Sequence, residues 1–234
     1  MTNFAAVERL LSESLDLKRR PIAISFLDAP PPGVQKFTGT MPSGCSFWNI
    51  AAEGRTFYTV PADHLNCPVG AYTHNVPLPE ARQQELTQAL ALMSDIGYIR
   101  MEEVPGIPRV AETPGAIVYA PLGETPVAPD AVIVSGPPGR LMLLHEAATR
   151  NGVPPQPLFG RPTCMAIPAV ATQSVASSMG CVGNRIYTEL SENDLYVTIA
   201  GKEVEAVARQ LATIVKANAA LTDHHKARRA TLTS

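Results

Sequence analysis

The chain has 234 residues, of which 45% are hydrophobic, with a formal net charge of −2 and a sequence isoelectric point of about 6.2. That length supports a real core in one domain or two small ones, and the charge offers no basic field for nucleic acid. No segment approaches the roughly 18 to 20 apolar residues of a membrane span, and the N-terminal residues lack the apolar core of a signal peptide. We therefore expect a cytoplasmic protein that binds neither nucleic acid nor membrane.

The first half of the chain alternates helical and strand-like patterns. Apolar residues recur at helical spacing near the N-terminus, and short β-rich runs follow it. Proline, which suits the first turn of a helix, opens a longer helical pattern. The predicted elements are a helix at 4–16, a strand at 22–27, one or two helical turns at 46–53, a strand at 56–60 and a helix from Pro79 to a stop near Gly97.

The second half repeats this alternation. Two apolar runs read as buried strands, and an amphipathic pattern near the C-terminus is the clearest helix of the chain. The predicted elements are strands at 116–120 and 131–135, a helix at 141–149, a strand at 195–199 and a helix from 202 to about 221. Residues 222–234 have no apolar period, so we expect a disordered tail.

These patterns predict an α/β or α+β fold, a mixed sheet with flanking helices, in one globular domain over residues 1–221. Strands joined through helices favour parallel pairing, although a short connection suits antiparallel pairing. Two segments, about 20–110 and 115–221, each run strand, loop, cysteine, apolar segment, strand-like segment, second cysteine and glycine. They are candidate pseudo-repeats. The alternative is that similar loop chemistry arose twice, because likeness this short is common by chance.

Four cysteines stand in turn-like segments rich in glycine, proline and polar residues. They are Cys45, Cys67, Cys164 and Cys181. Buried structural cysteines usually lie in apolar runs, whereas thiolates on loops suit a soft metal or an iron–sulfur cluster. No pair has the Cys-x-x-Cys spacing of zinc ribbons and thioredoxin-like redox sites. A 4Fe–4S cluster needs no short spacing, so the four residues are candidate ligands of one such cluster.

Two other interpretations of the cysteines stay open. Met165 and Met179 lie beside two of them, and thioethers together with thiolates can hold Cu(I), while thiolates alone can hold zinc. In the second alternative the thiols carry no metal at all.

The order and spacing of the cysteine motifs resemble those of a known family. The segments are Gly-Cys45-Ser-Phe-Trp-Asn-Ile-Ala, Asn-Cys67-Pro-Val-Gly-Ala, Pro-Asp130-Ala-Val-Ile-Val-Ser-Gly-Pro-Pro-Gly-Arg-Leu-Met, Thr-Cys164-Met-Ala-Ile-Pro and Ser-Met-Gly-Cys181-Val-Gly-Asn-Arg. Over roughly residues 5 to 215 the chain resembles the domain of unknown function 169 family, an archaeal conserved region. The resemblance implies a common fold and a site built on all four cysteines, but no reaction. Some relatives carry a further cysteine where this chain has Asn184, so a mechanism that needs a fifth thiol is not expected here.

Histidines near the cysteines are candidates for proton transfer. His64 lies three residues before Cys67, and His74 lies seven after it. Either could be a ligand or a proton donor beside a metal, or an ordinary loop histidine bonded to backbone. We take His64 as the candidate acid. His145, within an apolar helical segment, reads as a core histidine.

Polar residues flank the second pair of cysteines. Arg161 precedes Cys164, while Asn184 and Arg185 follow Cys181. A guanidinium could stabilise thiolates or bind an anionic substrate, and the amide could bond to a sulfur atom. We therefore take Arg161 and Asn184 as candidate cofactor-binding residues and Arg185 as a candidate catalytic residue. The alternative for both arginines is an ordinary surface ion pair.

Three functions from different classes fit this site. The first is a cytoplasmic redox protein that passes electrons through a 4Fe–4S cluster to a partner protein. The second is an enzyme that uses an iron–sulfur site on a small anionic substrate, with His64 as acid and Arg185 as anion clamp. The third is a zinc- or Cu(I)-binding module without turnover. A homo-oligomer is compatible with each of them.

Overall fold

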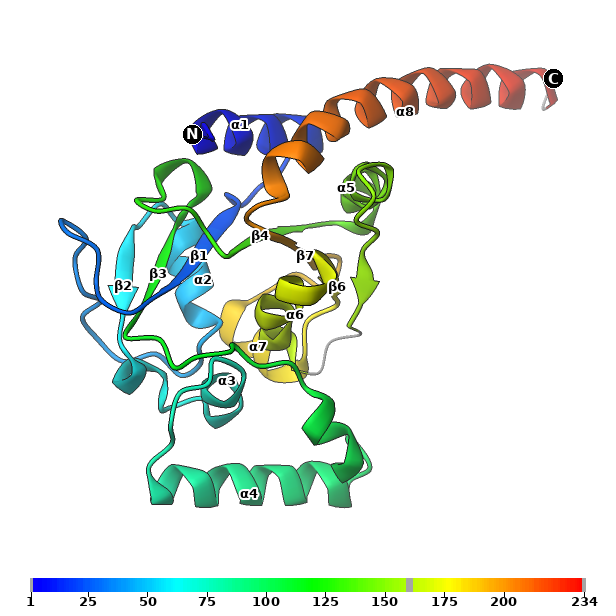
Figure 1. Ribbon diagram of the computed structural model, residues 1–234. Helices are drawn as coiled ribbons and strands as arrows, with labels where there is room; N and C mark the ends of the chain where they lie inside the picture. Colours follow the sequence, from blue (N-terminus) through cyan, green and yellow to red (C-terminus); the bar gives the residue numbers. More distant parts are fainter. Residues whose placement is uncertain (1, 159–161, 233–234) are drawn as a thin grey trace.

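The computed structural model describes residues 2–158 and 162–232 and contains a seven-stranded sheet with helices on both faces (Figure 1). Its strands are β1 Ile22–Leu27, β2 Phe57–Thr59, β3 Ala116–Pro121, β4 Ala131–Gly136, β5 Gln156–Pro157, β6 Val175–Ser178 and β7 Leu195–Ala200. Its α-helices are α1 Phe4–Leu15, α2 Ser46–Ala52, α3 Pro68–Thr73, α4 Glu80–Asp95, α5 Pro138–Arg150, α6 Ala166–Gln173, α7 Val182–Thr188 and α8 Val204–Leu232. Short 3-10 turns are η1 Pro61–His64, η2 Met101–Gly106, η3 Leu122–Glu124 and η4 Thr163–Met165.

The sheet separates two hydrophobic cores. On one face the helices α1, α5 and α8 pack over the sheet. Their buried apolar residues include Leu11 of α1, Leu144 of α5 and Leu211 of α8. On the other face α2 and α6 pack on the sheet around an aromatic cluster that includes Phe47 and Tyr119. Cys45 and Cys164 belong to this second core, so the cysteine site lies on the α2 and α6 face.

The strand order is β2-β3-β1-β4-β7-β6-β5. Among the described strands, only β5 and β6 pair in parallel, and every other strand pair is antiparallel. The expected preference for parallel neighbours is therefore wrong. β1 and β2, which a helix connects, do run in the same direction, but β3 inserts between them; β7 inserts between β4 and β6 in the same way.

The sheet has an internal two-fold pattern centred on the antiparallel pair β1 and β4. Moving outward, β1-β3-β2 on one side corresponds to β4-β7-β6 on the other. The registers also correspond: Leu27 opposes Ala116 as Gly136 opposes Leu195, and Thr59 opposes Ile117 as Ser178 opposes Tyr196. Even the outermost parallel contact recurs, since Lys36 bridges to Tyr58 as Pro157 pairs with Ser177.

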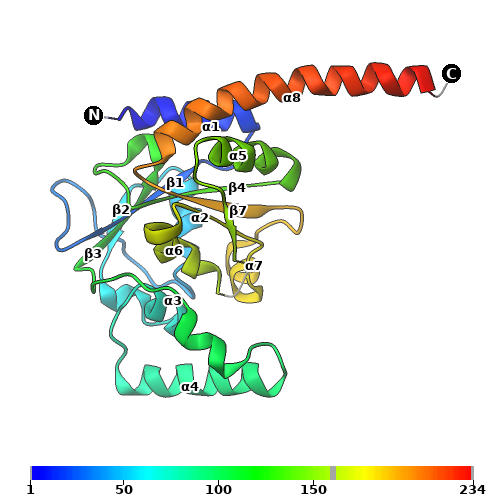
Figure 2. The same ribbon diagram turned by 45° about the vertical axis from the view of Figure 1, so that its right-hand side comes forward.

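Two helices depart from this compact arrangement. No residue of α4 is buried, and both views show it standing away from the sheet, next to α3 (Figures 1 and 2). The last helix α8 extends to Leu232, so residues 222–232, which the sequence predicts to be a disordered tail, are helical here and all exposed. Alanine, lysine, arginine and leucine favour helix, and neither glycine nor proline interrupts this stretch. No described helix is long and apolar enough to span a membrane.

Candidate functional site

All four cysteines lie where a helix begins. Cys45 and Cys67 directly precede α2 and α3, and Cys181 directly precedes α7. Cys164 lies in the turn η4, which continues into α6. Free backbone N–H groups at a helix start favour a thiolate over a thiol. At Cys181 one such contact is present, because its sulfur accepts from the Asn184 N–H at 3.5 Å.

The two-fold pattern makes the cysteines equivalent in pairs. Cys45 and Cys164 each precede a helix that leads to the outer strand, β2 or β6, and Cys67 and Cys181 each follow that strand. All four are free thiols; the first pair is buried and the second is half-buried. The arrangement therefore gives two buried and two partly accessible sulfur atoms.

Contacts join the members of each half. The Cys181 N–H donates to the Thr163 hydroxyl, next to Cys164. In the other half, a Cβ atom added to Gly70 would lie 3.0 Å from the Cys67 sulfur and 4.0 Å from the backbone nitrogen of Gly44. Glycine at position 70 therefore leaves room for the Cys67 sulfur, while its distance to the Cys45 segment is an ordinary contact.

The thiols of the two halves also influence one another. Burial raises the pKa of Cys45 to about 12, with Asn184 opposing this effect and Cys67 and Cys181 adding to it. Burial raises the pKa of Cys164 well above its usual value, and the other three thiols raise it further. A hydrogen bond with Thr73 opposes this rise. The buried thiols are thus neutral at pH 7, and bound metal would have to displace their protons.

Several buried polar atoms around the thiols have no hydrogen-bond partner. Two side chains with donor groups are affected, namely the Trp48 indole and the Tyr119 hydroxyl. Burial raises the pKa of Tyr119, and Cys45 and Cys164 raise it further, which places the phenol near those sulfur atoms. Buried donors in folded proteins are nearly always paired, so this cluster indicates that an acceptor belongs in the site. The Tyr119 hydroxyl was missed by sequence reasoning; its signal is one polar group in the apolar strand 116–120.

The spacing of the ligands distinguishes the kinds of metal site. A tetrahedral zinc ion with bonds of about 2.3 Å needs sulfur atoms roughly 3.8 Å apart. The part of the chain that the structure describes contains no group of three or more His, Cys, Asp or Glu side chains gathered to hold one metal ion. A cluster of several irons spreads its thiolates more widely than a single ion does.

His64 and His74 lie in the same core and are both buried. Their ring centroids are 5.6 Å apart. Burial lowers the pKa of His64 to about 3 and that of His74 to about 4. Both are therefore neutral imidazoles at pH 7, and His64 is a weaker candidate for a general acid than the sequence suggests.

The other site predictions have separate outcomes. Asn184 is buried, and its side chain lies close enough to Cys45 to lower the pKa of that thiol. The Arg185 guanidinium instead donates to the backbone carbonyl oxygens of Met179, Ser191 and Asp194, so its donors already hold the loop around α7. Arg161 lies outside the described residues.

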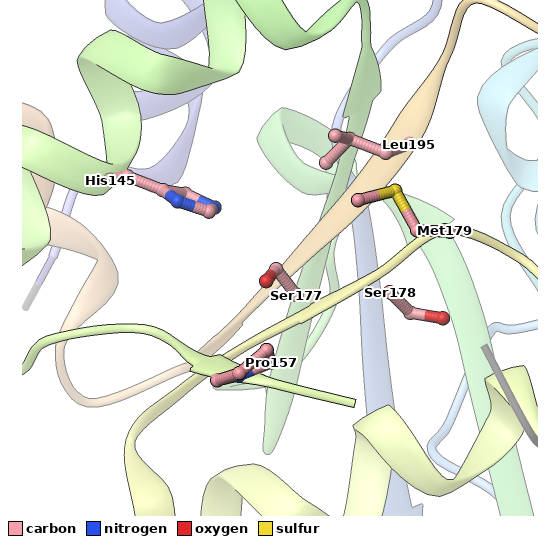
Figure 3. Close-up of a pocket in the computed structure, with 6 residues that line it drawn as sticks. All are labelled: His145, Pro157, Ser177, Ser178, Met179 and Leu195. Atoms are coloured by element: carbon pink, nitrogen blue, oxygen red, sulfur yellow. The ribbon is translucent and has the colours of Figure 1, made fainter. Parts of the chain in front are cut away.

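A small cavity lies away from the thiols, on the α5 side of β6 and β7 (Figure 3). It has a volume of about 50 Å³ and is lined by His145, Pro157, Ser177, Ser178, Met179 and Leu195. His145 is half-buried and points into it with an unpartnered Nε2 atom, and burial lowers the pKa of this imidazole. No cysteine lines this cavity, so it is separate from the thiol site.

Comparison with known families agrees with the motif resemblance. The domain of unknown function 169 family, described as "Uncharacterised ArCR", matches residues 10–210. The chain belongs to this family. A similar protein of Methanocaldococcus jannaschii, itself described as uncharacterised, is 28% identical over 173 residues, which are 68% of this chain and 71% of that protein. No solved structure matches the chain significantly.

Proposed function

We propose that Cys45, Cys67, Cys164 and Cys181 hold one 4Fe–4S cluster and that the protein transfers electrons. The observation that carries this proposal is the pairwise equivalence of the four cysteines under the two-fold pattern of the sheet, with each buried thiol responding electrostatically to the thiols of both halves. When bound, such a cluster supplies one-electron transfer.

The residues around the thiols suit this group. Cluster sulfur atoms accept hydrogen bonds, and the Trp48 and Tyr119 side chains carry unpartnered buried donors. The aromatic core of Phe47, Trp48 and Tyr119 excludes water from the buried side. Cys67 and Cys181 are only half-buried, so electrons would enter and leave near them.

Anaerobic purification and chemical analysis test the proposal. We expect a brown protein with about four iron and four acid-labile sulfide per chain, whose visible absorption bleaches on reduction and gives the EPR signal of a one-electron-reduced cluster. A colourless protein with one tightly held zinc or copper ion would support the thiolate-binding module instead.

The enzyme alternative keeps the same cysteine site and adds a small substrate. An anionic substrate is the less favoured version, because the Arg185 donors are engaged by backbone and both buried histidines are neutral. In either version we propose a cytoplasmic location. The partner would be a redox protein or a small molecule, not nucleic acid or membrane, and the protein could act as a homo-oligomer.

A further inference from the structure

A second cavity adjoins the small one between α5 and the strands β6 and β7. The small cavity, called the inner cavity from here on, has a volume of about 50 Å³ (Figure 3). The second, the outer cavity, has a volume of about 250 Å³ and is lined by Pro138, Leu141, Met142, His145, Glu146 and Leu195. His145 and Leu195 line both cavities, which therefore meet at these side chains. Because an apolar cavity of about 150 Å³ holds benzene, the outer cavity has room for one aromatic ring.

One face of α5 builds this space. The residues that α5 contributes to the two cavities follow the i, i+3, i+4 spacing of a single helix face, namely Pro138, Leu141, Met142, His145 and Glu146. This helix has no counterpart in the other half of the two-fold pattern. β4 leads through α5 to β5, whereas β1 leads to the bridge at Lys36 through residues 28–35, which contain no helix. The cavities are therefore a feature of the second half alone.

Two polar groups point into the inner cavity. Figure 3 shows the Ser177 hydroxyl on the side of β6 that faces His145, whereas the Ser178 hydroxyl points to the other side and accepts from the Gly180 N–H. His145 Nε2 is buried and has no partner. The Ser177 side chain makes no hydrogen bond with any of the described residues. A few unpaired polar groups in a mostly apolar cavity are typical of a small-molecule site, where they fix the orientation of the ligand.

A hydroxyl group on the guest suits both polar groups. Burial lowers the pKa of His145, so the ring is neutral at pH 7, and its Nε2 atom either donates or accepts according to the tautomer. The Ser177 hydroxyl can do both. A guest hydroxyl can therefore donate to one of the two groups and accept from the other whichever tautomer is present. A carbonyl oxygen could only accept.

The charges around the cavities disfavour an anionic guest. Among the described residues that line them, Glu146 alone is charged, and its charge is negative. Helix α5 begins at Pro137 and Pro138, and proline has no N–H group to offer an anion. Arg140, in the first turn of α5, pairs with Asp16 at 3.3 Å. These features favour an uncharged guest.

Exposed thioethers stand at both cavities. Met142 lines the outer cavity and is 50% exposed, while Met179 lines the inner one and is 51% exposed. A guest that packs against them removes apolar surface from water. Thioethers adapt their shape to a ligand and make favourable contacts with aromatic rings. The body of the guest is therefore best matched by an aromatic ring.

We propose that the two cavities together bind a small, uncharged aromatic molecule that carries a hydroxyl group, a ligand of the phenol class. The hydroxyl lies between His145 and Ser177, and the ring packs against Leu195 and the methionines. No cysteine lines either cavity, so this site is separate from the proposed cluster and binds its ligand whether or not iron is present.

The test uses the purified full chain with ¹³C-labelled methionine methyl groups and phenol as the probe. The NMR signals of Met142 and Met179 are assigned with Met142→Leu and Met179→Leu. We expect phenol at pH 7 to shift both signals saturably and to leave the other methionine signals in place. Benzoate, which has the same ring but a negative charge, should give no saturable shift. The proposal is wrong if phenol moves neither signal or if benzoate binds as tightly as phenol.

Variants separate hydrogen bonding from simple filling of an apolar space. His145→Phe and Ser177→Ala should each weaken phenol binding by about fivefold, the effect of one lost hydrogen bond, while the binding of toluene, which has no hydroxyl, stays unchanged. His225→Phe, on the exposed part of α8, should bind phenol as the wild type does. Methionine spectra without probe check that each variant is folded, and Ser177→Ala decides the outcome if His145→Phe is not. Unchanged phenol binding in the folded variants, or equal losses for phenol and toluene, would contradict the proposed hydroxyl contacts.

Discussion

At the residue scale, His64 and His74 make the stability of the fold depend on pH. Unfolded histidines have a pKa near 6.5, while burial lowers the folded values to about 3 and about 4. As the pH falls below 6.5, the unfolded state therefore binds protons that the folded state does not. The stabilising contribution is present above pH 6.5 and is lost toward pH 4, at up to roughly 1.4 kcal/mol per pH unit for each histidine.

We expect His74→Gln to reduce this acid sensitivity. Between pH 7 and pH 5 its free energy of unfolding, measured by urea denaturation, should fall by about 2 kcal/mol less than that of the wild type. His224→Gln is the control, since His224 is exposed on α8, and it should follow the wild type. Equal pH dependence in His74→Gln and the wild type would mean that His74 is not buried as a neutral ring.

We expect Arg185→Ala to lower the stability of the fold without changing the proposed cluster site. The guanidinium donates to three carbonyl oxygens of the loop segments around α7, and hydrogen bonds to charged groups contribute about 1.5–3 kcal/mol each when well buried. Because Arg185 is half-buried, we expect a total loss of about 1–3 kcal/mol and a Tm lower by several degrees. Arg209→Ala, which removes an exposed i,i+4 pair with Glu205, should change little. An unchanged Tm in Arg185→Ala, together with a changed reduction potential or weaker binding of an anionic substrate, would restore the role predicted from sequence.

At the element scale, α8 combines a core helix and an exposed extension. Leu211 is fully buried under α5, whereas Leu221 is 56% exposed. We expect Leu211→Ala to lower the free energy of unfolding by about 2–5 kcal/mol, and Leu221→Ala by less than about 0.5 kcal/mol. Chemical denaturation of both variants measures this. Similar losses in the two would show that the extension is packed against something in solution, such as a second copy of the chain.

Helices and strands whose apolar residues recur with a regular period were predictable from sequence. The predicted helix 4–16 and strand 22–27 correspond to α1 and β1 within one residue, because the apolar period there matches the core that buries them. The end of α8 was not predictable, because among the described residues the core contacts of this helix end at Ile214 and Val215. There, intrinsic helix propensity alone sets the structure.

At the scale of the whole molecule, the sequence offered two similar halves as one of two interpretations, and it did not show how such halves would join. The antiparallel pairing of β1 with β4 depends on contacts more than 100 residues apart, which no local pattern encodes. The insertion of β3 and β7 between connected strands has the same origin. These pairings are what turn four separate cysteine motifs into two equivalent pairs.

The candidate site, like the sheet, was predictable only where local sequence carries the signal. The cysteines stand out in sequence because of their glycine and proline surroundings. Tyr119 and the neutral state of His64 follow only from burial in the folded core. Arg185, close to Cys181 in sequence, is turned to backbone carbonyls by the loop that follows α7.

The central claim is that four thiolates from both halves hold one cluster. Its most direct test is iron and acid-labile sulfide per chain in the wild type and in the Cys→Ser variants at positions 45, 67, 164 and 181, all purified anaerobically. We predict about four iron and four sulfide in the wild type and loss of most of both in each variant, since a hydroxyl is a poor ligand for a soft cluster. Met179→Leu, an exposed neighbour of Cys181, should retain full content. Full retention of iron in Cys67→Ser and Cys181→Ser, or a wild type without iron, would contradict the account.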